Sequence, residues 1–168
     1  MYQKIKYPFS WHLPKHSIEF DVEKFISYRF NKIIKQYNME KSITFSISNE
    51  KNNIPIAVNN NNKITFYKEP INYILGVFET ESARKCWLLL MMFHELMHSI
   101  YPNNGFKNNF EYEDFINKKA RRALAKNVKK YTIKTIESEY CRWGKYVNYD
   151  IWYLLSFGEI ENWYISKK

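Results

Sequence analysis

The chain has 168 residues, of which 45% are hydrophobic and 18% aromatic, so it is long and apolar enough to bury the core of one globular domain. Its 4 Gly and 5 Pro exclude a fibrous or low-complexity chain, and its 2 Cys exclude a disulfide-rich scaffold. The formal net charge of +9 favours anionic partners such as nucleic acid, although a basic surface that only confers solubility explains the same charge.

The N-terminal residues carry no recognisable export signal. Residues 1–16 are basic but contain neither a continuous apolar stretch nor a small-residue cleavage site. The longest apolar run, residues 86–93, is too short to span a bilayer. We therefore expect a cytoplasmic protein without a membrane span. The abundance of Asn, Lys and Ile suggests an AT-rich genome, such as that of a virus or mobile element.

The first half of the chain predicts one helix and a small sheet. Residues 21–39 have apolar side chains at helical spacing, and Asp21 is placed to cap them. Three short runs have the composition of strands: residues 43–47, 54–58 and 64–67. The Asn-rich segment 59–62 favours a turn between the last two, because Asn tolerates left-handed backbone angles. Residues 71–78 are compatible with either a further strand or a loop.

The second half predicts helices. A helix from Thr80 to about Tyr101 is apolar nearly all round, which is typical of a central, buried helix. A loop over 103–109 leads to a third helix, from about Asn108 to Tyr131.

Together these elements predict an α+β fold in a single domain over residues 1–168. Its core, about 21–131, contains an N-terminal helix, a small mixed or antiparallel sheet, the buried helix and the third helix. Residues 132–168 are rich in Tyr and Trp and predict a helical C-terminal extension. No internal repeat or linker indicates a second domain, and the sequence predicts no oligomeric state.

The most informative motif is His94-Glu95-Leu96-Met97-His98 in the buried helix. Positions i and i+4 lie on one helix face, so both imidazoles can bind one metal ion. This HExxH pattern is typical of zinc sites, and Glu95 would lie beside the zinc-bound water as general base. The alternative is a pair of buried, hydrogen-bonded core histidines.

A catalytic zinc site needs a third protein ligand, and the third helix offers one. Its predicted inward stripe consists of Ile116, Ala120, Leu124, Val128 and Tyr131. At about 100° per residue, Glu113 projects onto the centre of this stripe, whereas Glu111 lies roughly opposite. A carboxylate on a buried face must be paired or bind a metal. Glu113 is therefore the predicted third ligand.

Other donors remain open as the third ligand. Glu111 has a structural explanation, because it can complete an N-terminal cap with Asn108. Asp114 lies about a quarter-turn from the stripe. His12 and His16 could reach the site from the N-terminus. No histidine follows the motif, which excludes the three-histidine pattern HExxHxxGxxH.

The motif HELMH lies on a predicted buried helix and is followed by a short loop and a helix that opens with Glu-Tyr-Glu-Asp. This order resembles the gluzincin branch of the zincin metallopeptidases. It looks most like the ImmA/IrrE type and the minimal gluzincins, over residues 21–131. The resemblance implies a zincin-like fold, one Zn²⁺ ion and these roles: His94, His98 and Glu113 as ligands and Glu95 as catalytic base. Asp114 departs from the family pattern, which tends to have Ala there.

The resemblance implies a zinc-dependent endopeptidase that acts on an intracellular protein. An extended substrate would pair with an edge of the sheet. The oxyanion of the reaction would need a further donor, commonly Tyr or His. The candidates are Tyr140, Tyr146 and Tyr149.

The third helix suggests an alternative function. Residues 117–134 contain several basic and no acidic side chains, so a non-catalytic zincin-like module could bind nucleic acid or a protein partner there. The candidate contacts are Lys118, Lys119, Arg121, Arg122, Lys126 and Lys130. A solvated helix face explains the same charges. The presence of Glu95 favours the enzyme, because a purely structural metal site does not need a base.

Overall fold

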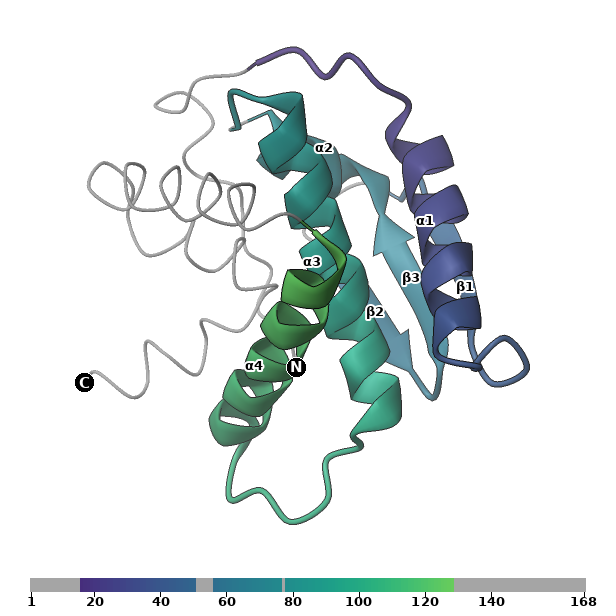
Figure 1. Ribbon diagram of the computed structural model, residues 1–168, viewed down its shortest axis with the longest axis vertical. Coiled ribbons are helices and arrows are strands. Elements are labelled where there is room, and N and C mark those ends of the chain that lie inside the picture. Colours follow the sequence, from purple (N-terminus) through teal and green to yellow (C-terminus); the bar gives the residue numbers. More distant parts are fainter. Residues whose placement is uncertain (1–15, 51–55, 77, 129–168) are drawn as a thin grey trace, which may run out of the picture.

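The described part of the chain combines four helices with one small sheet. The computed structural model describes residues 16–50, 56–76 and 78–128, and the structural statements below concern these residues. Their α+β architecture with a three-stranded mixed sheet confirms the predicted fold class (Figure 1). The predicted C-terminal extension over 132–168 lies outside the described residues, so the domain bounds stay a prediction.

Helix α1 (Val22–Gln36) begins at a capped first turn. The carboxylate of Asp21 accepts a hydrogen bond from the backbone N–H of Lys24 at 2.9 Å. The predicted helix end at Met39 is wrong, because Asn38 adopts a left-handed conformation with φ 54° and turns the chain. The buried stripe of the helix consists of Val22, Ile26, Phe30, Ile33 and Ile34.

The sheet has the strand order β1-β3-β2. The strands are β1 (Thr44–Ser48), β2 (Ala57–Asn60) and β3 (Lys63–Tyr67). The central strand β3 runs parallel to β1 and antiparallel to β2. Asn61 and Asn62, with φ of 50° and 66°, form the turn between β2 and β3. The turn predicted over 59–62 is therefore too long, since Asn59 and Asn60 belong to β2.

Helix α2 (Lys68–Leu75) follows the sheet directly. It corrects the prediction of a strand or loop over 71–78. Pro70 is accommodated because it lies in the first turn, where its missing N–H would have no helical partner. The buried residues of α2 are Pro70, Ile71, Ile74 and Leu75. A short apolar run does not distinguish a helix from a strand, which explains the error.

Helix α3 (Glu81–Ile100) is the central helix. The hydroxyl of Thr80 caps it by accepting a hydrogen bond from the N–H of Ala83 at 3.1 Å. Its residues are buried almost continuously up to Met97, as the sequence predicts. Burial raises the pKa of the Cys86 thiol to about 12, so this residue stays protonated and packs as a small hydrophobe. Within the described ranges, no helix combines the length and apolarity needed to cross a membrane.

Helix α4 (Asn109–Asn127) lies alongside α3 (Figure 1). The side chain of Asn108 caps it by accepting a hydrogen bond from the N–H of Glu111 at 2.9 Å. The predicted helix end near Tyr131 is wrong, because Val128 already has extended backbone angles (φ −129°, ψ 157°). The buried residues of α4 are Tyr112, Ile116, Ala120, Ala123 and Leu124.

Helices α1 and α3 cover the same face of the sheet. Ile64 and Phe66 alternate along β3 and are buried on that face. Phe30 of α1 packs against Phe66, with ring centroids 5.1 Å apart. Asn59 of β2 lies opposite Ile64 in the register, so it shares the face, and its side chain contacts α3. The core therefore lies between the sheet and these two helices.

This packing predicts a large loss of stability for Phe30→Ala. The Phe30 ring is fully buried between Phe45 and Phe66, so its removal should lower the free energy of unfolding by about 3–5 kcal/mol. The change is measured by urea unfolding followed by circular dichroism. Tyr28→Ala on the same helix is the control, since Tyr28 is 65% exposed and its loss should cost less than about 0.5 kcal/mol. Equal losses in the two variants would contradict this packing.

Candidate metal centre

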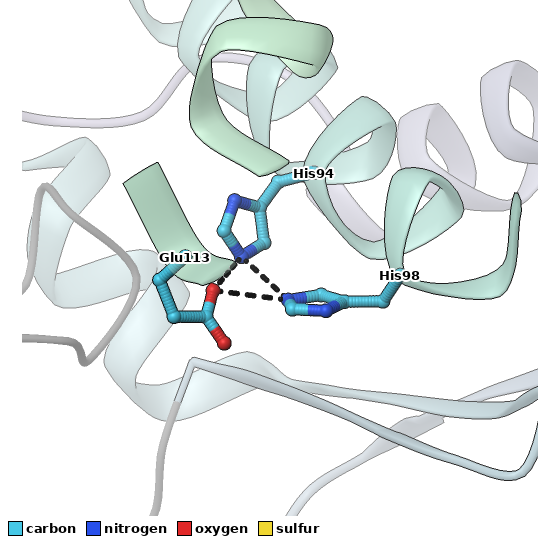
Figure 2. A group of neighbouring side chains, drawn as sticks. All are labelled: His94, His98 and Glu113. Carbon is cyan, nitrogen blue, oxygen red and sulfur yellow. Dashed lines mark hydrogen bonds and ion pairs between the residues drawn. The ribbon is translucent and has the colours of Figure 1, made fainter. Parts of the chain in front are cut away.

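Helices α3 and α4 bring two imidazoles and a carboxylate together. In Figure 2, His94 and His98 extend from α3 and Glu113 extends from α4 toward a common point. Oε2 of Glu113 lies 3.5 Å from Nε2 of His94 and 3.2 Å from Nε2 of His98. The two Nε2 atoms are 3.1 Å apart. In the described part of the chain, these three residues form a group whose ligand atoms could hold one metal ion.

The distances agree with the geometry of a tetrahedral zinc site. Ligand atoms bound at about 2.0–2.1 Å, with tetrahedral angles between them, lie about 3.3 Å from one another. The three observed separations of 3.1, 3.2 and 3.5 Å cluster around this value. The donor set of two His and one Glu is also one that zinc accepts in catalytic sites. The residues present therefore fit a zinc ion.

A hydrogen bond that His94 donates to α4 orients its imidazole. Nδ1 of His94 lies 2.8 Å from Oδ1 of Asn117. Because an amide oxygen only accepts hydrogen bonds, Nδ1 carries the proton. In the neutral imidazole, the lone pair is then on Nε2, the atom that faces Glu113 and His98.

His98 is oriented in the same way through a tyrosine. The hydroxyl of Tyr112 donates its proton to the carbonyl oxygen of Tyr101 at 2.8 Å. Its oxygen therefore accepts the hydrogen bond from Nδ1 of His98 at 3.0 Å. Burial and the carboxylates of Glu113 and Glu95 raise the pKa of Tyr112 to about 12, so the phenol keeps this proton.

Two nitrogen lone pairs and a carboxylate oxygen therefore converge on one point. Without a cation, such an arrangement is repulsive, and a divalent ion between the three atoms removes that repulsion. His94 is only 2% exposed, whereas the side chains of His98 and Glu113 are 17% and 20% exposed. The ligand oxygen of Glu113 is itself buried, so the partial exposure of this centre comes from other atoms of His98 and Glu113.

Glu95 lies in the same buried region and is 4% exposed. Burial raises the pKa of its carboxyl, the positive charges that His94 and His98 can carry lower it, and Glu113 raises it further. Glu95 directly follows His94 on α3, and its carboxyl interacts electrostatically with all three candidate ligands. A carboxylate in this position can accept a proton from a group bound between them.

The other candidate ligands within the described residues do not join this group. Glu111 and Asp114 lie on the exposed side of α4, where the backbone of Glu111 is capped by Asn108. The backbone N–H of His16 bonds to the carbonyl of Gly76, and His16 is not in the metal-ligating group. Four other candidates for the site lie outside the described residues: His12, Tyr140, Tyr146 and Tyr149.

The basic residues of α4 are partly engaged within the chain. Lys118 forms an ion pair with Asp114 at 2.6 Å. The ammonium of Lys119 lies over the rings of Tyr101 and Phe115, at 4.8 and 5.2 Å from their centroids. Of the other predicted phosphate contacts, three are exposed and the last lies outside the described residues: Arg121, Arg122, Lys126 and Lys130. Nucleic-acid binding stays a prediction.

Three residues that complete the surroundings of the centre are not among those predicted from the sequence: Asn117, Tyr112 and Asn59. Asn117 follows Glu113 by one helical turn, so it lies on the same face of α4. A metal-bound imidazole needs an acceptor for its second N–H, and this requirement points to Asn117. No sequence pattern relates Tyr112 to His98, or Asn59 to α3.

Comparisons with known proteins find no match to this chain among protein families, curated proteins or solved structures. The chemistry of the site is therefore inferred from its own residues.

The tyrosine bond predicts weaker metal binding in Tyr112→Phe. The variant keeps the buried ring but removes the acceptor of the His98 Nδ1–H, so zinc affinity should fall about 10–100-fold. Competition with a chromogenic chelator measures this affinity. Tyr101→Phe is the matched control, because it removes a hydroxyl but keeps the carbonyl that Tyr112 uses. If both variants bind zinc as the wild type does, the proposed role of the Tyr112 hydroxyl is wrong.

Proposed function

We propose that this chain is a zinc-dependent endopeptidase of the zincin type, which hydrolyses peptide bonds of a protein target. The observation that carries the proposal is the convergence of the His94 and His98 Nε2 atoms with the Glu113 carboxylate, beside the buried carboxyl of Glu95. The order of elements also supports it, since a helix and a small sheet precede the helix with the HExxH motif and the helix with the third ligand.

In this mechanism, the three ligands hold the ion and Glu95 moves the proton. A zinc ion held by His94, His98 and Glu113 would supply a bound water with a pKa of about 7 and a Lewis acid for the carbonyl group. The Glu95 carboxylate accepts the proton of the attacking water and passes it to the nitrogen of the leaving amine. The hydrogen bonds that His94 and His98 donate to Asn117 and Tyr112 keep both imidazoles aligned through the cycle.

The sheet offers a place for an extended substrate. Among the described residues, β2 pairs only with β3, so its other edge has backbone groups free to bond a further strand. β2 also lies against α3, which carries the two histidines. A peptide that pairs with this edge would lie beside the metal centre in an extended conformation.

Two substitutions separate the roles of the carboxylates. Glu95→Gln should retain about one zinc per chain and lose proteolysis about 10²–10⁴-fold, because the amide cannot accept the proton. Glu113→Gln should lose both zinc and proteolysis, because a neutral amide is a poorer ligand than a carboxylate. Zinc is measured by atomic absorption after dialysis, and proteolysis by cleavage of unfolded casein.

The control for these measurements is Glu111→Gln, which removes an exposed carboxylate from the same helix and should change neither property. Full zinc occupancy in Glu113→Gln would refute the ligand assignment. Undiminished cleavage by Glu95→Gln would refute the catalytic role of Glu95.

A further inference from the structure

A single amide joins the edge strand to the helix of the metal centre. Nδ2 of Asn59, in β2, donates hydrogen bonds to the carbonyl oxygen of Glu95 at 3.0 Å and to the hydroxyl of Ser99 at 2.8 Å. Oδ1 of the same side chain accepts a hydrogen bond from the N–H of Asn62 at 3.0 Å. The three bonds use both hydrogens of the amide and one acceptor position.

These bonds connect β2 to the part of α3 that carries the ligands. Glu95 follows His94, and Ser99 follows His98, so the amide is attached to the same two turns that present the imidazoles. Its third bond, to Asn62, attaches it to the turn that ends β2. Two directional contacts from this side chain therefore link β2 to the turns of α3 that carry the histidines, and the third fixes the amide to its own turn.

An apolar residue would suit a purely structural contact at this position. Asn59 lies on the face of the sheet that covers the core, and its neighbour on that face, Ala57, packs against the core cluster. An aliphatic side chain would bury more apolar surface there. A part-buried amide instead makes bonds whose length and direction specify one arrangement of strand and helix.

We propose that Asn59 is a positioning residue that holds the substrate-pairing edge of β2 at a fixed distance from the metal centre. This inference rests on the proposed function. If the strand moved relative to α3, a peptide paired with β2 would present its carbonyl away from the metal centre. An error of about 1 Å in such an alignment is enough to slow catalysis substantially. Asn59 would then affect the binding of an extended peptide without affecting the binding of the metal.

The experiment compares two hydroxamates on the zinc-loaded, full-length chain. Acetohydroxamate binds the metal and has no peptide to pair with β2. A tetra-alanine peptide with a succinyl hydroxamate group binds the metal in the same way and adds an extended backbone. The ratio of their dissociation constants reports pairing with the strand, and a partly unfolded sample lowers both affinities equally.

In Asn59→Ala, the affinity for the peptide hydroxamate should fall about tenfold. This loss corresponds to the net free energy of about one to two hydrogen bonds. The affinities for zinc and acetohydroxamate should stay within about twofold of the wild type. Ser99→Ala removes one of the bonds and should give a smaller loss in the same direction. Asn31→Ala is the control, because its amide also donates to a carbonyl oxygen, that of Ser27 at 2.9 Å, but from α1.

The possible outcomes separate this inference from the proposed function. If the wild type binds zinc and acetohydroxamate but Asn59→Ala leaves the ratio of the two dissociation constants unchanged, the positioning role is wrong. A wild-type chain that binds the peptide hydroxamate no better than acetohydroxamate overturns the pairing with β2. If the wild type binds neither zinc nor acetohydroxamate, the proposed function itself fails.

Discussion

The burial of α3 is the constraint on which the rest of the structure depends. A helix buried on nearly all sides can carry His94 and Glu95 only if their polar atoms have partners, because an unpaired buried polar group is costly. The neighbouring elements supply partners for both imidazoles of the motif and for the backbone of Glu95. Asn117 and Tyr112 of α4 accept from the imidazoles, and Asn59 of β2 donates to the backbone of α3. The contacts that pack the central helix are therefore the same contacts that orient the residues of the site.

One face of helix α4 provides most of the side chains that contact the two histidines. Tyr112, Glu113 and Asn117 occupy adjacent positions on the side that meets α3, and each contacts one or both histidines. The two partners of the Nδ1 atoms are neutral, whereas the residue that faces the Nε2 atoms is the carboxylate. Negative charge is thus concentrated where a cation would bind. With Glu95, two carboxylates would balance the charge of a divalent ion in this buried place.

The sequence predicts the starts of the helices well, because the capping interactions that begin them join residues close together in the chain. Asp21 and Asn108 cap the helices as predicted, and Thr80 caps the helix that is predicted to begin there. A side chain that bonds an N–H three residues on needs no tertiary partner. The prediction was less accurate where local preferences compete. The short apolar run around Ile71 suits a strand or a helix, and only its packing as α2 decides between them. Similarly, four consecutive Asn residues favour a turn, but pairing with β3 places the first two in the strand.

The sequence alone determines the chemistry available to the site: the histidine spacing is a property of one helix, and the inward position of Glu113 follows from the periodicity of another. Only the tertiary structure decides how those groups are used. The partners of the His94 imidazole, the His98 imidazole and the Glu95 backbone carbonyl lie 23, 14 and 36 residues away in the chain. No periodicity relates positions so far apart on different elements. The direction of the Nε2 lone pairs and the placement of β2 beside the centre therefore arise only when α4 and the sheet pack against α3.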